Sequence, residues 1–198
     1  MADQTIQVKI SLYGNAETGK SSLASRYLTG EFNYNYIQTL GVGFREKTIS
    51  VQNQQVVLSL WDIGGEEEFQ QMIPLSADGA HALIFVFDLT QRQSLAGLKN
   101  WYRNVRQLNQ EGFSIIVGTK YDIFEQTMSA EDKAEILSHA RKYAKAMGNA
   151  PLIFTSAAKG INVVRLFKLI VSMVFGLNSG IEKVTEVDKP IFEYEEAQ

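Results

Sequence analysis

The sequence contains no cysteine among its 198 residues, and it has only three prolines. Without cysteine the chain can form no disulfide, thiolate metal site, palmitoyl attachment or C-terminal prenyl attachment. A large excess of one charge is also missing, because the formal net charge is -3. Neither nucleic acid nor an anionic membrane is therefore an expected partner. Residue 2 is Ala, which argues against N-myristoylation, so we expect no direct lipid anchor.

Long hydrophobic runs are absent as well. No apolar stretch approaches the length of a membrane span, and the first residues do not look like a secretory signal peptide. The composition, with 45% hydrophobic and 21% charged residues, is ordinary for a globular domain. We therefore expect one sizeable cytoplasmic domain with a full hydrophobic core.

Apolar runs typical of buried strands alternate with helical patterns along the chain. This alternation predicts an α/β fold with a six-stranded, mostly parallel sheet and helices on both faces. The connection 52–55 is too short for a helix, so the second and third strands should form an antiparallel hairpin. Strands are predicted over 7–13, 44–51, 56–62, 82–88, 114–119 and 152–155. Helices are predicted over 19–29, 94–109, 130–147 and 162–175, with a weaker one within 67–75.

The clearest motif is Gly14-Asn15-Ala16-Glu17-Thr18-Gly19-Lys20-Ser21, which fits the phosphate-binding P-loop pattern G-x-x-x-x-G-K-[ST]. It lies between a predicted strand and a predicted helix, as the motif requires. Backbone N–H groups of such a loop bind phosphate oxygens, and the helix N-terminus adds partial positive charge. Lys20 is expected to reach the terminal phosphates and the Ser21 hydroxyl to ligate Mg²⁺. The motif indicates a nucleoside triphosphate but does not identify the base.

Two further stretches lie where a nucleotide-dependent switch needs them. Thr39, in the loop before the hairpin, can place its hydroxyl on Mg²⁺ and its N–H on a γ-phosphate, although alone it is an ordinary loop residue. Asp62, at the end of an apolar strand, can hold Mg²⁺ through water. Gly64 and Gly65 permit close approach of the backbone to a phosphate.

A last pair of stretches can recognise the base. Asp122, in Gly118-Thr119-Lys120-Tyr121-Asp122, can accept from guanine N1–H and the N2 amine, which adenine does not offer, and the stem of Lys120 can cover the base face. Residues 155–157 follow the last predicted strand and can supply N–H groups to guanine O6. Each stretch is weak alone, but all of them fall at the C-terminal ends of strands, where such sheets bind ligands.

With these motifs the chain resembles the small GTPases of the Ras superfamily over about residues 6–178. The resemblance implies a P-loop NTPase G domain over 1–178, followed by an acidic tail over 179–198 that is partly ordered at best. It implies that Phe32 stacks on the guanine edge and that Ser21, Thr39 and Asp62 hold Mg²⁺. The implied nucleotide-binding residues are Asn15, Ala16, Glu17, Thr18, Gly19, Lys20, Ser21, Ser22, Phe32, Tyr36, Thr39, Gly65, Thr119, Lys120, Asp122, Ser156, Ala157 and Ala158.

A narrower resemblance is to the septum-promoting GTPases of mitotic-exit and septation signalling. It rests on 38–42, 46–50, 61–65, 101–103, 118–122 and 140–147, and on Thr119, where most small GTPases carry Asn. Members of that branch act from spindle poles through scaffolds and a downstream kinase. The resemblance implies an exchange factor, a GTPase-activating protein or scaffold, and an effector kinase as partners. It also implies recruitment to a spindle pole or centrosome by a scaffold.

The chain departs from the superfamily pattern at Ala16, at Ala158 and, most seriously, at Glu66, which occupies the position of the glutamine that orients the attacking water. The implied catalytic residues are thus Lys20, Thr39, Gly65 and Glu66. Beside a triphosphate an ionised Glu66 meets like charge, so we expect it to swing out and hydrolysis to be slow; held inside, it can act as a base. A GTP/GDP switch and a GTP-binding interaction module with little hydrolysis both remain open, whereas a small-metabolite kinase leaves the guanine motif unexplained.

Overall fold

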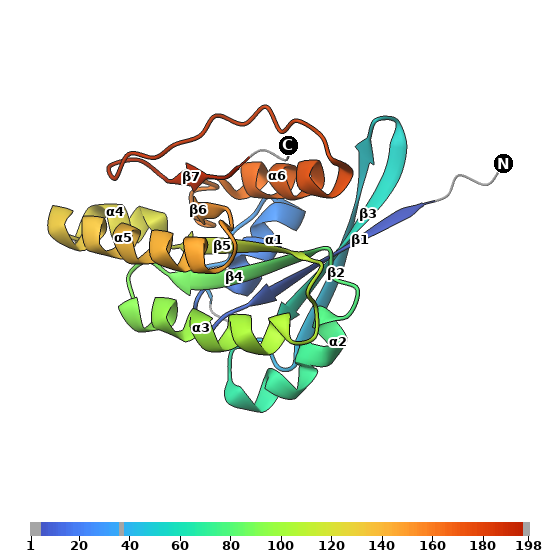
Figure 1. The fold of residues 1–198 in the computed structure, drawn as a ribbon, viewed down its shortest axis with the longest axis horizontal. Coiled ribbons are helices and arrows are strands. Elements are labelled where there is room, and N and C mark those ends of the chain that lie inside the picture. The colour runs from blue at the N-terminus through green and yellow to red at the C-terminus, as the bar shows by residue number, and fades with distance from the viewer. Residues whose placement is uncertain (1–4, 36–37, 196–198) are drawn as a thin grey trace.

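The structure is a computed structural model that describes residues 5–35 and 38–195. Its strands are β1 Ile6–Tyr13, β2 Val42–Val51, β3 Gln54–Ile63, β4 Ala82–Asp88, β5 Phe113–Thr119, β6 Leu152–Phe154 and β7 Phe192–Glu193. They form one sheet in the order β2-β3-β1-β4-β5-β6-β7 (Figure 1). The central pairs are parallel, and only the β2–β3 and β6–β7 pairs are antiparallel, which confirms the predicted α/β class.

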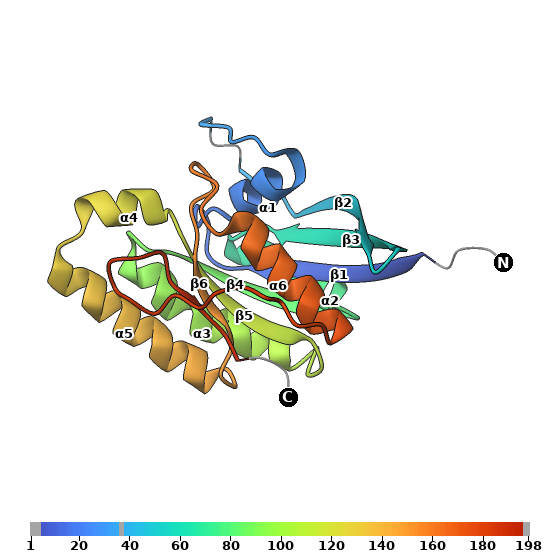
Figure 2. The ribbon, with the colours of Figure 1, turned by 90° about the horizontal axis from the view of Figure 1, so that it is seen from above.

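Helices cover both faces of this sheet (Figure 2). On one face lie α1 Lys20–Thr29 and α6 Val163–Phe175, and on the other lie α2 Ile73–Ala77, α3 Arg92–Arg106 and α5 Ala130–Ala146. A 3₁₀ segment, η1 Glu67–Met72, leads into α2, and the short helix α4 Tyr121–Thr127 follows β5. No helix within the described ranges is both long and apolar enough to cross a bilayer.

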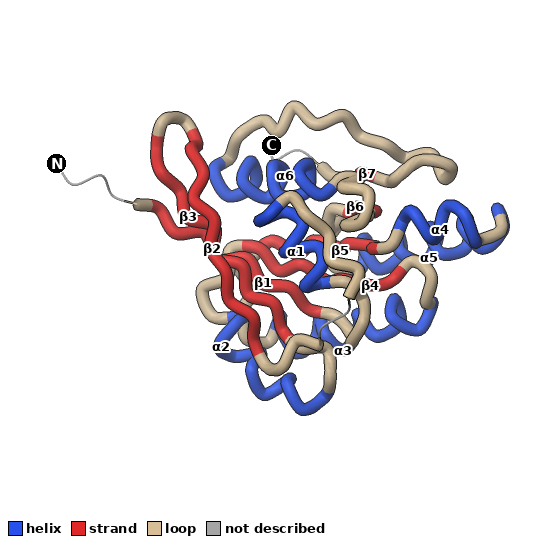
Figure 3. Tube along the Cα trace, turned by 180° about the vertical axis from the view of Figure 1, so that it is seen from behind, coloured by secondary structure: helices blue, strands red, loops and turns tan. Residues whose placement is uncertain are grey.

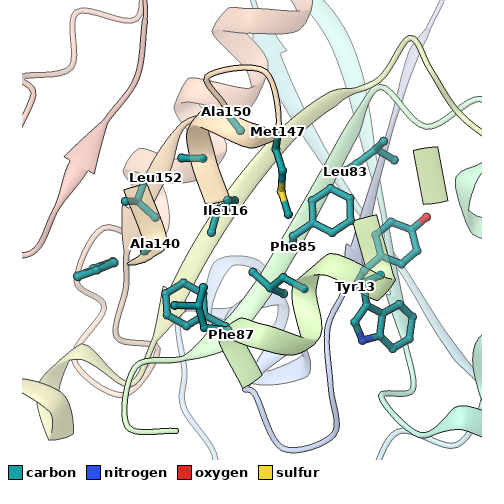
Figure 4. Close-up of a cluster of buried hydrophobic side chains, with 14 of the residues drawn as sticks. Tyr13, Leu83, Phe85, Phe87, Ile116, Ala140, Met147, Ala150 and Leu152 are labelled. Carbon is teal, nitrogen blue, oxygen red and sulfur yellow. The ribbon is translucent and has the colours of Figure 1, made fainter. Parts of the chain in front are cut away.

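The hydrophobic core has two halves because successive side chains of a strand point to opposite faces. In β4, Leu83, Phe85 and Phe87 face α3 and α5, whereas the intervening Ile84 and Val86 face α1 and α6. Figure 4 shows the first half, in which Tyr13 of β1 and the rings of β4 belong to the same cluster as apolar side chains of β5, β6 and α5. This two-sided burial fixes the sheet between its helices. The C-terminal ends of the parallel strands then lie together along one side of the sheet.

Local sequence signals account for several element ends. Gln52 and Asn53 form a two-residue turn with positive φ at both positions, which suits the twist of the predicted hairpin. The side chain of Ser129 accepts from the backbone N–H of Asp132 and begins α5, and Gly148 at φ 78° follows its end, as expected. Helix α4 was not expected from the sequence, because it has only seven residues and no apolar period of its own.

The C-terminal segment differs from our expectations in two ways: the sheet has seven strands instead of six, and the expected loose tail packs on the domain. Residues 177–191 arch over α6 and return to the sheet, where β7 adds a seventh strand beside β6 (Figures 1 and 3). Ile191 and Phe192 are fully buried there. The acid Glu193 pairs with Arg141 of α5. We call residues 177–195 the C-terminal strap; its buried apolar side chains, Ile181, Ile191, Phe192 and Tyr194, are too few to form a recognisable pattern in the sequence.

Candidate nucleotide-binding site

A cavity of about 630 Å³ lies at the C-terminal ends of the central strands, between the P-loop and the loop of residues 30–41. We call that loop the switch I loop and residues 64–72 the switch II segment. The predicted residues Ala16, Glu17, Gly19, Lys20, Ser21, Ser22, Phe32, Thr39, Gly65, Glu66 and Lys120 all line the cavity, together with Gln38 and Asp62. The P-loop and the two switch regions therefore meet in one place, whereas of the base-recognition stretches Lys120 lines the cavity and Asp122, Ser156, Ala157 and Ala158 do not.

The P-loop is bent in a way that only certain residues tolerate. A Cβ on Gly14 would lie 2.1 Å from the carbonyl oxygen of Val86, so no side chain fits between β1 and β4 there. Glu17 adopts the left-handed conformation, at φ 61°, in the middle of the loop. Helix α1 begins at Lys20 without a side-chain cap, which leaves its first N–H groups free for an anion.

Lys20 is buried beneath this loop. Its Nζ donates to the carbonyl oxygens of Gly14 at 2.8 Å and Asn15 at 2.9 Å. Burial lowers the pKa of Lys20 to about 8, and the nearby carboxylates of Asp62 and Glu66 raise it only in part. A bound phosphate would favour the charged form, so the geometry suits an anionic ligand.

Three side-chain oxygens that could bind a metal ion lie together beside Lys20, and they come from three different segments. The Ser21 and Thr39 hydroxyl oxygens are 2.7 Å apart, and Thr39 Oγ1 lies 3.4 Å from Asp62 Oδ2. Asp62 is 8% exposed, its Oδ1 has no hydrogen-bond partner, and burial raises its pKa. A buried carboxylate with an unused oxygen beside two hydroxyls fits Mg²⁺, which takes oxygen ligands and phosphates. Elsewhere in the described residues, no group of three or more His, Cys, Asp or Glu side chains is arranged to hold a metal.

The switch II segment packs directly on the P-loop. A Cβ on Gly65 would lie 2.1 Å from the backbone nitrogen of Ala16, and one on Gly64 would lie 2.3 Å from the ring of Phe69. The N–H of Gly64 also donates to the carbonyl of Gly41 at 2.8 Å. Both glycines are therefore needed for the closed arrangement of the two switch regions.

Glu66 lines the cavity in this structure, and its expected displacement beside a bound triphosphate stays a prediction. Its Oε1 accepts a hydrogen bond of 2.7 Å from Nε2 of Gln38 in the switch I loop. It also contributes to the electrostatic field at Lys20. The sequence gives no sign of this pairing, because the two residues lie 28 positions apart on different loops.

At the opposite end, the predicted base-recognition residues are tied to one another. The Ser156 hydroxyl donates to Asp122 Oδ1 at 2.6 Å, which orients the carboxylate. Lys120 has φ 59°, and its Nζ pairs with the buried Asp88 at 2.7 Å, which leaves its stem along the cavity wall. Asp88 was not predicted as part of the site, although it ends an apolar strand as Asp62 does.

Thr119 is hydrogen-bonded to the backbone and does not line the cavity. Its hydroxyl lies 2.6 Å from the carbonyl oxygen of Thr18 and 3.0 Å from that of Phe87, so its single proton is used on the backbone. Thr119 therefore ties the base-recognition loop to the P-loop and has no proton left for the base.

The remaining predicted residues are placed as follows. Phe32 lies edge-on to Tyr34, with ring centroids 4.9 Å apart, at the cavity mouth. Ala157 and Ala158 are half-buried after β6, and Tyr36 lies outside the described residues. The side chain of Asn15 faces away from the cavity and accepts from Trp101 Nε1 at 2.9 Å, a support from α3 that the sequence did not indicate.

Comparisons with known proteins agree with this site. The model of the Ras family matches residues 9–175. Septum-promoting GTP-binding protein 1 of Schizosaccharomyces pombe is 42% identical over 197 residues, covering 98% of each chain. The Ras-related protein SEC4 of Saccharomyces cerevisiae is 32% identical over 84% of this chain and 74% of its own. Human Ras-related protein Rab-31 is 30% identical over 93% of each chain.

Proposed function

The chain belongs to the Ras family, and from this premise we propose that it is a guanine-nucleotide-dependent molecular switch. It binds GTP or GDP with Mg²⁺, hydrolyses GTP slowly and signals through the switch I loop and the switch II segment. The observation that carries the proposal is the meeting of the Ser21, Thr39 and Asp62 oxygens beside the P-loop. Because Thr39 comes from a loop, loss of the γ-phosphate would release that loop and change the surface that a partner reads.

Each residue of the site has a defined task in this proposal. Lys20 and the N–H groups of the P-loop bind phosphate oxygens, and the oriented carboxylate of Asp122 accepts from the guanine N1–H and N2 amine. Ser21, Thr39 and Asp62 would hold Mg²⁺, which neutralises charge on the phosphates when it is bound. The purified protein should therefore carry GDP or GTP, and comparable affinities for ADP and GDP would refute the assignment of the base.

The second candidate function is a GTP-binding interaction module with little hydrolysis, and Glu66 is the observation that favours it. Single-turnover hydrolysis on protein loaded with GTP separates the two functions. The switch predicts phosphate release on the order of 10⁻⁴ s⁻¹ without an activating protein. Tight GTP binding with no release of phosphate would establish the interaction module.

The pathway is inferred from the S. pombe relative, whose name describes a septum-promoting protein. We propose that this chain acts in septation or cytokinesis control from the cytoplasm, with a scaffold recruiting it to a spindle pole or centrosome. Its partners would be an exchange factor, a GTPase-activating protein and an effector kinase. Expression of this chain in S. pombe cells that lack the relative tests the pathway. Restored septation by the native chain, but not by Ser21→Asn, would support it, and failure of a well-expressed native chain would count against it.

A further inference from the structure

The switch I loop and the switch II segment are joined by one side-chain contact at the phosphate end of the cavity. It links Gln38 to Glu66, and both residues line the cavity near Lys20 and Thr39. Glu66 is half-buried there and Gln38 is exposed. We propose that Gln38 is a positioning residue, which holds the Glu66 carboxylate where it accepts a hydrogen bond from the water that attacks GTP. This proposal rests on the function proposed above.

The chemistry of the two side chains supports this division of labour. A glutamine at position 66 would offer both an acceptor and donors, whereas an ionised glutamate offers acceptors only. The Gln38 amide has two N–H donors, and one of them donates to Glu66 Oε1. Glu66 is therefore left as the acceptor for the water, and Gln38 supplies the hydrogen bond that holds the carboxylate.

Electrostatics explain why the carboxylate needs a partner at this place. A free carboxylate beside a triphosphate is repelled and turns to solvent. A hydrogen bond from an amide to a charged oxygen is stronger than one between neutral groups. The positive charge of Lys20 also lies close enough to interact with Glu66. The hydrogen bond from Gln38 and the attraction of Lys20 oppose the repulsion and keep the carboxylate at the phosphate end.

In the reaction, the water oxygen forms a bond to the γ-phosphorus as the bond from the γ-phosphorus to the β–γ bridging oxygen breaks. The electron pair of the broken bond stays on that oxygen, which leaves with GDP. A proton of the water passes to the Glu66 carboxylate and then to the phosphate product, so Glu66 ends the cycle unchanged. Gln38 touches neither the water nor the phosphate in this step and acts only through Glu66.

A double-mutant cycle on the full chain tests the coupling, with single-turnover GTP hydrolysis as the first readout. We expect Gln38→Ala to slow hydrolysis by roughly fivefold to tenfold, the rate equivalent of one partly exposed hydrogen bond. Gln38→Glu should slow it further, because it puts two carboxylates together. In the Glu66→Gln background, Gln38→Ala should change the rate by less than about twofold. The exchanged pair, Gln38→Glu with Glu66→Gln, restores the contact and should be faster than Gln38→Glu alone.

Two measurements keep a structural effect apart from this positioning role. The release rates of fluorescent GDP and of a non-hydrolysable GTP analogue should stay within about twofold in Gln38→Ala, and so should all rates in the control Gln93→Ala, an exposed glutamine of α3 outside both switch regions. Unchanged hydrolysis in Gln38→Ala would overturn the proposal, as would an equal loss in both Glu66 backgrounds. If the native chain itself binds GTP but releases no phosphate, the proposed hydrolysis fails as well, and the native protein alone reveals that outcome.

Discussion

The two ends of the nucleotide cavity are built differently. At the phosphate end the walls are loops, and η1 of the switch II segment has no buried residue. Leu40 of the switch I loop, next to Thr39, is 75% exposed. At the base end Lys120 lines the cavity, and the neighbouring strand-end residues Thr119 and Ser156 are buried and hydrogen-bonded. The comparison teaches that one half of the cavity can respond to the γ-phosphate while the other half holds the nucleotide in place.

The C-terminal strap accounts for much of this difference. The N–H of Phe154 in β6 donates to Ile191 of the strap at 2.9 Å. The buried amide of Asn162 donates to the carbonyls of Phe154 at 2.9 Å and Pro190 at 3.2 Å. The Tyr121 hydroxyl reaches Asp188 O at 3.4 Å. Both base-recognition loops are thus backed by the strap, whereas nothing comparable covers the switch II segment in the described chain.

The largest effect should come from the base end itself. Asp122→Asn replaces an acceptor of two guanine N–H groups with an amide, so GDP affinity should fall by a factor on the order of 10³ to 10⁴. The affinity for xanthine nucleotides should rise. Competition of GDP and XDP against a fluorescent nucleotide measures this change. The control Glu125→Gln changes a charge on the same helix outside the cavity, and a GDP affinity retained in Asp122→Asn would show that Asp122 does not read guanine.

The next effect concerns the strap. Phe192 is fully buried between β6 and α6, so Phe192→Ala should lower the free energy of unfolding by about 3 to 5 kcal/mol. GDP release should also become faster, because β6 leads into the base-recognition residues. Urea unfolding and fluorescent-GDP release are the measurements. In Leu40→Ala at the exposed phosphate end, the unfolding free energy should change by less than about 0.5 kcal/mol. Unchanged GDP release in a destabilised Phe192→Ala protein would show that the strap does not support the base end.

A smaller effect is expected at the phosphate end. Thr39→Ala removes one hydroxyl from the proposed Mg²⁺ site, and the loss of a contact to a charged group corresponds to about 1.5 to 3 kcal/mol. Affinity for a GTP analogue should fall by that amount while GDP affinity stays nearly constant, since only the γ-phosphate state uses this loop. Calorimetric titration of both nucleotides checks the difference. Equal losses for GTP and GDP would mean that Thr39 does not distinguish the two states.

The gathering of polar residues could be predicted because their motifs are tied to fixed positions at strand ends. Lys20, Ser21 and Asp62 line one cavity, and Asp122 lies just after β5, paired with Ser156; their roles in binding a nucleotide stay predictions. The supports of the site were missed for a physical reason: each depends on contacts between distant segments. The strap has few apolar anchors and no period, so its return to β6 is invisible in the sequence. The Gln38–Glu66 pairing depends on the path of an irregular loop, which hydrophobic patterns do not specify.

The smallest effect is expected at the P-loop, to which Thr119 of the base end is hydrogen-bonded. Trp101 is 3% exposed, and its Nε1–H donates to Asn15 Oδ1, while the Asn15 carbonyl accepts from Lys20. Trp101→Phe keeps an aromatic ring in the core but removes the donor, so we expect a coupling energy of about 1 kcal/mol with Asn15→Ala in a double-mutant cycle of urea unfolding.

GDP release should speed up by roughly fivefold in Trp101→Phe, because the P-loop residue whose carbonyl accepts from Lys20 loses its hydrogen bond to α3. Trp61→Phe, which changes the other tryptophan on β3, is the matched control and should leave GDP release nearly unchanged. Strictly additive unfolding energies at positions 15 and 101 would mean that α3 packs beside the P-loop without supporting it.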